Sequence, residues 1–124
     1  MIHEEICTYE VCKLAKEKGF GEMASCYQGY RKDGTLFYFS NMPDGKERVM
    51  QTDCLAPTQS LLQRWLREEK NIDIAIVPLY TGGYSYIVYN IHCRDNRVVN
   101  TNAGYDTYEL ALEDALKYAL ENLI

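Results

Sequence analysis

The stretch IDIAIVPLYTGGYSYIVYNIH, residues 72–92, decides the fold class of this chain. Isoleucine stands at every second position from Ile72 to Ile76, which is the two-residue period of a strand. A turn follows at Thr81-Gly82-Gly83, and a second alternating segment runs from Tyr84 to His92. Residues 72–92 therefore predict an antiparallel hairpin.

Three segments around this hairpin have the spacing of amphipathic helices. The first is predicted over residues 9–18, after an N-cap at Thr8 and before a left-handed stop at Gly19. The second follows Ala56-Pro57-Thr58 and ends at Asn71, and the third begins after Asp106 or Thr107. Their expected buried stripes are Val11, Leu14 and Ala15, then Leu61, Leu62, Trp65 and Leu66, then Leu112, Ala115, Leu116, Ala119, Leu120 and Leu123.

Turn residues complete the order of elements. Asp33-Gly34 between Met23–Tyr30 and Thr35–Ser40 predicts another hairpin, and Asn41–Asp53 predicts a long exposed loop. The polar run Arg94-Asp95-Asn96-Arg97 predicts a tight turn before a short strand at Val98–Asn102.

The resulting order is α-β-β-α-β-β-β-α. We expect an α+β fold in which helices pack on one face of an antiparallel sheet. With 124 residues and 14.4 kDa, the chain is predicted to form a single domain, 1–124.

Charge and hydropathy limit the partners. Thirteen basic against eighteen acidic residues give a net charge of -5, which repels a nucleic-acid backbone at long range, so nucleic acid is disfavoured as a partner. The longest apolar run is far shorter than the roughly 20 residues of a membrane span, and Met1–Glu10 carries acids where a signal peptide would be basic and then apolar. We therefore expect a cytoplasmic protein without membrane contact.

Reactive side chains are few and badly spaced for chemistry. The five cysteines, Cys7, Cys12, Cys26, Cys54 and Cys93, contain no Cys-x-x-Cys pair, and the two histidines, His3 and His92, form no metal motif. No nucleotide-binding glycine pattern occurs either. We predict no catalytic, metal or cofactor residues and expect buried, reduced thiols, with Cys7 and Cys12 packed together as a hydrophobic staple.

Tyrosine is the most unusual feature, at eleven residues. A tyrosine ring gives a large contact area and keeps a polar tip, so it suits protein interfaces and base stacking, although it is also a common strand residue. Candidate interface residues are Tyr80, Tyr84, Tyr86 and Tyr89 on one hairpin and Tyr27 and Tyr38 on the other.

The leading hypothesis for the function is a non-enzymatic protein-binding or accessory module that contacts another protein or a second copy of this chain. The alternatives are a single-stranded nucleic-acid binder that uses these tyrosines and a cysteine-dependent enzyme.

Three segments resemble small uncharacterised proteins from phage and mobile elements of gut Bacteroidetes. They are APTQSLLQRWLRE (residues 56–68), KLAKEKGF (residues 13–20) and the terminal helix from Tyr108 to Ile124. The resemblance implies an intracellular bacterial setting, such as that of a prophage, and carries over no activity or site residue. The predicted order over 58–124 is also similar to that of a double-stranded-RNA-binding domain, but acidic residues stand where that family has a basic cluster.

Overall fold

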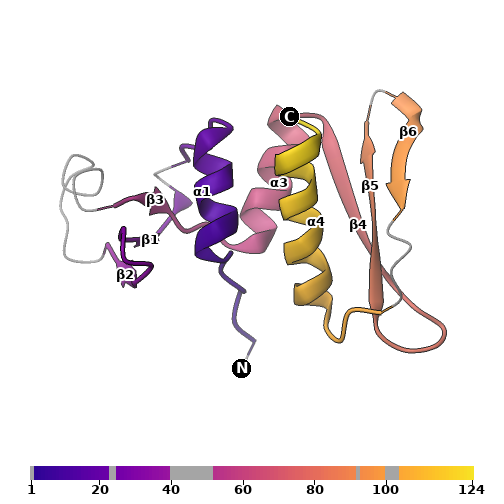
Figure 1. Cartoon of the computed structure of the whole chain (residues 1–124), viewed down its shortest axis with the longest axis horizontal. Coiled ribbons are helices and arrows are strands. Elements are labelled where there is room, and N and C mark those ends of the chain that lie inside the picture. The colour runs from indigo at the N-terminus through magenta and orange to yellow at the C-terminus, as the bar shows by residue number, and fades with distance from the viewer. Residues whose placement is uncertain (1, 23–24, 40–51, 92, 100–103) are drawn as a thin grey trace. The chain divides into compact units, whose positions relative to one another are not determined.

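The computed structural model describes residues 2–22, 25–39, 52–91, 93–99 and 104–124, with the backbone alone for 93–99 (Figure 1). The chain divides into two compact units, Met1–Thr58 (unit 1) and Gln59–Ile124 (unit 2). Each unit combines helical structure with its own three-stranded antiparallel sheet. The α+β class is confirmed, and two sheets take the place of the expected one. The single domain stays a prediction.

Unit 1 begins with helix α1 (Tyr9–Glu17), close to its predicted bounds. Thr8 is the N-cap, and its Oγ1 accepts a hydrogen bond from the Val11 amide at 3.4 Å. The helix stops before Gly19, whose φ of +100° is a conformation that glycine adopts without steric cost.

The sheet of unit 1 has the order β2-β1-β3. Strands β1 (Gln28–Tyr30) and β2 (Leu36–Tyr38) form the predicted hairpin around Gly34, whose φ is +86°. Strand β3 (Cys54–Leu55) pairs with β1, and the sequence pattern does not predict it. Most of the predicted 41–53 loop lies outside the described residues.

Small thiols and aromatic rings dominate the core of unit 1. The buried apolar side chains are Cys7, Val11, Cys12, Ala15, Phe20, Cys26, Phe37, Phe39, Cys54 and Ala56. Gly29 lies where there is no room for a side chain, because an added Cβ would be 2.7 Å from Thr52 Cγ2 and 2.8 Å from Phe39 Cζ.

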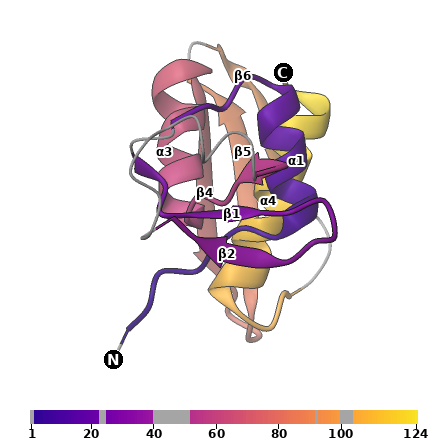
Figure 2. The ribbon, with the colours of Figure 1, turned by 90° about the vertical axis from the view of Figure 1, so that its left-hand side faces the viewer.

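Unit 2 has longer elements. They are α3 (Gln59–Glu69), β4 (Ile72–Pro78), β5 (Tyr84–Asn90), β6 (Cys93–Val99) and α4 (Tyr108–Asn122). The sheet order is β4-β5-β6, and both helices lie on one side of this sheet, in front of it in Figure 2. Asn71, with φ +57°, ends α3 as expected, and Thr107 caps α4 through a 3.1 Å hydrogen bond from the Leu110 amide.

The alternation in unit 2 sorts the residues of its sheet onto two faces. Ile72 and Ile74 on β4 and Tyr86 and Val88 on β5 are buried on the face that α3 and α4 cover. The helices contribute the predicted Leu62, Leu66, Leu112, Ala115, Leu116, Ala119 and Leu120, and Trp65 is buried too. The expected core position of Trp65 is confirmed.

The prediction of a turn at Arg94-Asp95-Asn96-Arg97 is wrong. These residues belong to β6, whose first residue, Cys93, pairs with Asn90 of β5. The pairing shifts register between Tyr89 and Asn90, which fits a bulge. A polar edge strand has the composition of a turn, and pairing with β5 decides its structure.

Candidate functional site

The six candidate tyrosines are divided between the two units and differ in exposure. Tyr27 and Tyr38 belong to unit 1 and are 75% and 69% exposed, while Tyr80 in the β4–β5 turn of unit 2 is fully exposed. Tyr84 and Tyr89 are partly exposed, and Tyr86 is only 6% exposed. Tyr86 therefore belongs to the core of unit 2 instead of the expected contact surface.

Contacts within unit 2 account for the partly exposed tyrosines. Tyr84 packs edge-on against Tyr108 of α4, with ring centroids 6.0 Å apart. Tyr89 points to the opposite face of the sheet, and its hydroxyl donates to Asp73 Oδ2 at 2.9 Å. Both side chains thus have structural roles beside their strand propensity.

The outer edge of β2 carries two of the exposed apolar side chains of unit 1. The Arg31 amide donates to the Thr35 carbonyl, and the Phe39 amide donates to the Tyr27 carbonyl, each at 2.9 Å. Because bonding directions alternate along an antiparallel pair, the backbone groups of Leu36 and Tyr38 point away from β1. The side chains of these two residues share one face of β2 and are 39% and 69% exposed. We call Leu36 and Tyr38 the β2 edge.

The corresponding edge of unit 2, strand β4, is capped by side chains. The outward amide of Ile74 donates to Asp73 Oδ1 at 3.0 Å, and the outward Ile74 carbonyl accepts from Gln63 Nε2 at 2.9 Å. Pro78, at the end of β4, has no amide hydrogen. These features protect β4 from pairing with a further strand.

A second feature of unit 1 is a polar cluster that the sequence analysis missed. The Tyr9 hydroxyl donates to Asp53 Oδ2 at 2.5 Å, and Lys16 Nζ donates to the Asp53 carbonyl at 2.5 Å. Lys13 Nζ lies 5.1 Å from the centre of the Tyr9 ring. A pocket of about 320 Å³ is lined by Lys13, Lys16, Glu17 and Asp53. No sequence signal joins Tyr9 to Asp53, which are 44 positions apart.

Electrostatics in this cluster hold its groups in fixed protonation states. The hydrogen bond to Asp53 raises the pKa of Tyr9 to about 12. The same hydrogen bond, with the nearby charges of Lys13 and Lys16, lowers the pKa of Asp53. Tyr9 therefore stays protonated and Asp53 ionised at neutral pH, so this pair has no proton to exchange with a substrate in that range.

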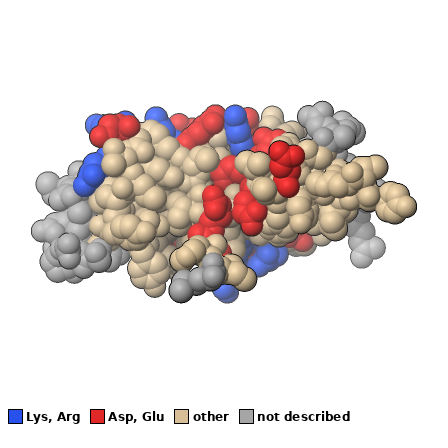
Figure 3. Space-filling view, turned by 90° about the horizontal axis from the view of Figure 1, so that it is seen from below, with Lys and Arg blue, Asp and Glu red and all other residues tan. Residues whose placement is uncertain are grey.

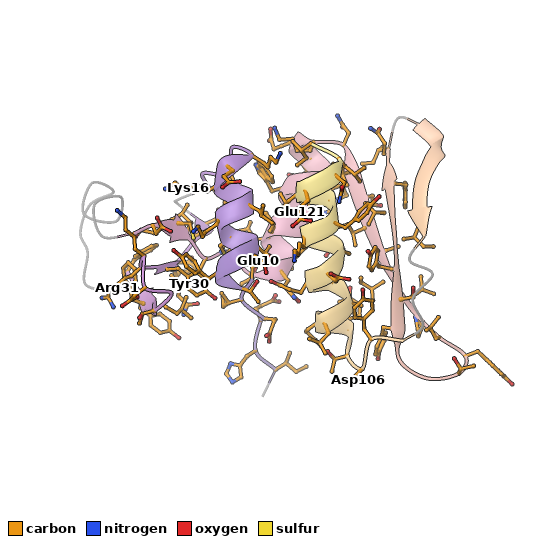
Figure 4. All side chains as sticks on the ribbon, in the orientation of Figure 1. Glu10, Lys16, Tyr30, Arg31, Asp106 and Glu121 are labelled. Atoms are coloured by element: carbon orange, nitrogen blue, oxygen red, sulfur yellow. The ribbon has the colours of Figure 1, made fainter. Side chains whose placement is uncertain are left out.

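The third feature of unit 1 is a set of buried thiols, and the Tyr30 side chain, which hydrogen bonds to the backbone of one of these cysteines, is labelled in Figure 4. The thiols of Cys12 and Cys54 share a hydrogen bond. This hydrogen bond and the burial of Cys54 both raise the pKa of the Cys54 thiol. Cys12 Sγ also lies 3.6 Å from the Cys7 carbonyl, which accepts a 2.7 Å hydrogen bond from the Tyr30 hydroxyl. Cys7 and Cys12 are thus both buried, as expected, but Cys12 contacts the backbone of Cys7 and the thiol of Cys54.

The fourth described cysteine, Cys26, also has a thiol whose pKa is raised. Burial, with the nearby charge of Glu22, raises the pKa of Cys26 to about 11. A thiolate is the reactive species, so raised pKa values leave Cys26 and Cys54 protonated at neutral pH. Within the described ranges, no three His, Cys, Asp or Glu side chains gather as a metal site would require.

In the part of the chain that the structure describes, none of the helices has the length and apolar character needed to cross a bilayer.

Comparisons with known proteins identify no relative of this chain. No protein-family model, curated protein or solved structure matches the chain.

Proposed function

We propose that this chain is a non-enzymatic protein-binding module and that its partner contacts the β2 edge. The observation that carries the proposal is the coincidence, at Leu36 and Tyr38, of exposed apolar side chains with backbone groups directed away from the sheet. An extended segment of another protein that pairs with such an edge gains main-chain hydrogen bonds and side-chain contacts together.

Two observations favour this function over the alternatives. The raised pKa values of Cys26 and Cys54 argue against a cysteine nucleophile. Acidic residues exceed basic ones in the sequence, and acidic side chains are visible on the face shown in Figure 3. The Arg31 guanidinium, which a phosphate could otherwise contact, lies 4.4 Å from the centre of the Phe37 ring. Nucleic acid is therefore the weaker partner. A cytoplasmic location and a prophage origin belong to the same proposal.

The test compares variants of two exposed tyrosines, Tyr38 of unit 1 and Tyr80 of unit 2. Wild type, Tyr38→Ala and the control Tyr80→Ala are immobilised, and bound proteins from a bacterial lysate are quantified by mass spectrometry. We expect at least one protein to bind wild type and Tyr80→Ala equally and to bind Tyr38→Ala at least tenfold less. Circular dichroism checks that both variants keep the fold, which we expect because both side chains are exposed.

Equal retention of every bound protein by all three baits would refute the role of the β2 edge. Light scattering after size exclusion, with and without a mixed single-stranded oligonucleotide, addresses the alternatives. A dimer that Tyr38→Ala disrupts would identify a second copy as the partner. Salt-sensitive retention of the oligonucleotide would instead support nucleic-acid binding.

A further inference from the structure

We infer that Cys12 and Cys54 are a redox-active pair, which closes to a disulfide between α1 and β3 by exchange with a small-molecule disulfide such as glutathione disulfide. The two cysteines lie in the interior of unit 1, and their chemistry is independent of whether the β2 edge binds a protein.

The geometry of unit 1 brings the two thiols together. Cys12 lies on the buried face of α1, and Cys54 lies in β3, which packs against this helix (Figure 1). Both side chains are buried, and their thiols are hydrogen bonded. A hydrogen bond between two thiols already places the sulfur atoms near each other, and a disulfide requires them to approach to about 2.05 Å.

Neighbouring cysteines are not equivalent partners. Cys7 offers Cys12 its backbone carbonyl, since Cys12 Sγ lies 3.6 Å from that oxygen. At Cys26 the causes of the raised pKa are burial and Glu22, and no thiol contributes. With no three-residue metal cluster among the described side chains, the pair is better suited to thiol exchange than to metal binding.

Glutathione disulfide is the oxidant that accepts the two electrons in this reaction. One protein thiol loses its proton and attacks a sulfur of glutathione disulfide, giving a mixed disulfide and one glutathione thiolate, which takes up a proton. The second protein thiol then attacks the mixed disulfide and releases the second glutathione in the same way. Two protein thiols lose two electrons and two protons, and one glutathione disulfide becomes two glutathione molecules.

Burial sets the rate of this exchange. Glutathione disulfide reaches the pair only when α1 opens locally, and the attacking group must be a thiolate. Because the pKa of Cys54 is raised, attack by the Cys54 thiol is slow at neutral pH and accelerates as pH rises. Once formed, the disulfide joins α1 to β3, and β3 pairs with β1 of the hairpin sheet.

The cysteine spacing allows an unambiguous test. Cleavage after glutamate places every cysteine in a different fragment, namely 6–10, 11–17, 23–47, 48–68 and 70–109. The folded protein is equilibrated with glutathione and its disulfide at mildly alkaline pH, free thiols are alkylated, and fragments are analysed by mass spectrometry without reduction. We expect a cross-link between 11–17 and 48–68, with the loss of two hydrogens from the intact chain.

Variants sharpen the assignment. Cys26→Ser is the matched control, because Cys26 is equally buried, and we expect it to keep the cross-link. Cys12→Ser and Cys54→Ser should lose it completely. The inference is overturned if wild type keeps all its thiols free, if 6–10 or 23–47 replaces either expected fragment, or if the cross-link forms only in denaturant. The wild-type result decides the question even where a variant fails to fold.

Discussion

The two units reach a packed core by different means. Unit 2 has seven-residue strands and a fifteen-residue helix, and its core repeats leucine and alanine along α4. Unit 1 has strands of two or three residues, and its core contains four cysteines and three phenylalanines. Regular periodicity organises unit 2, whereas unit 1 depends on particular contacts between segments far apart in the sequence.

Side-chain hydrogen bonds between residues far apart in the sequence add to the short strands of unit 1. Tyr9 and Lys16 of α1 both bind Asp53, and Tyr30 of β1 binds the Cys7 carbonyl. Such bonds fix short segments that few ladder hydrogen bonds hold. The comparison implies that cavities damage unit 2 most and that steric or polar changes damage unit 1.

The largest expected effect is a cavity in unit 2. Trp65→Ala should lower the free energy of unfolding by about 3 to 5 kcal/mol, because the buried indole leaves a void that its neighbours fill only partly. Urea unfolding followed by circular dichroism measures the change. Trp65→Phe, which keeps most of the apolar volume, is the control and should lose less. An unchanged midpoint in Trp65→Ala would place the ring at the surface and would remove it from the core of unit 2.

A steric change should damage unit 1 less. Gly29→Ala brings a methyl group to within 3 Å of Thr52 and Phe39, and overpacking of this kind costs about 1 to 3 kcal/mol. Gly21→Ala is the matched control, since nothing lies within 4 Å of an added Cβ there. We expect the control to unfold at the wild-type urea concentration or slightly above it. Equal urea midpoints for both variants would show that the residues around Gly29 can move to accommodate a methyl group. Unit 1 would then not depend on close packing at Gly29.

The same contrast explains how much of the fold the sequence predicts. The alternation from Ile72 and the leucine and alanine repeat after Thr107 predict β4, β5 and α4, since each element extends over several periods. Strand β3 has two residues, too few to show a period. The run 94–97 has turn composition, and only its pairing with β5 makes it a strand.

The candidate site is less predictable than the fold. Sequence reasoning finds the exposed Tyr27, Tyr38 and Tyr80, but it groups them with Tyr86, which alternation places on the helix-covered face. The pairs Tyr9–Asp53 and Cys12–Cys54 join α1 to the end of a long connection, so no local pattern marks them. Their proximity depends on how β3 packs against α1.

The helix caps allow a smaller comparison between the units. Thr107→Ala should cost about 1 kcal/mol, because Thr107 Oγ1 accepts a 3.1 Å hydrogen bond from an amide of the first turn of α4. The equivalent bond at Thr8 is 3.4 Å, so Thr8→Ala should cost less. Serine at either position keeps the acceptor and serves as the control. A larger loss at Thr8 than at Thr107, measured by urea unfolding, would contradict the ranking.

The smallest expected effect is the pH dependence of the Tyr9–Asp53 hydrogen bond. The folded pKa of Tyr9, about 12, exceeds its ordinary value of 10.0, so this contribution to stability is complete below about pH 10 and is lost as pH rises towards 12. The folded pKa of Asp53 is lowered, so its contribution is complete above the ordinary carboxyl pKa of 3.8 and is lost as pH falls through the lowered value.

Tyr9→Phe removes the part of both contributions that comes from the hydrogen bond, and it keeps the ring. The difference in unfolding free energy between wild type and Tyr9→Phe should therefore be constant between about pH 4 and pH 10 and narrow beyond each limit. Carbon-13 NMR of the Asp53 carboxyl in Tyr9→Phe should show its pKa rising towards the ordinary value. Tyr27→Phe changes an exposed tyrosine of the same unit and should leave the titration of Asp53 as in wild type. If Asp53 titrates identically in wild type and Tyr9→Phe, the hydrogen bond does not control this carboxylate, and the lysines alone hold it ionised.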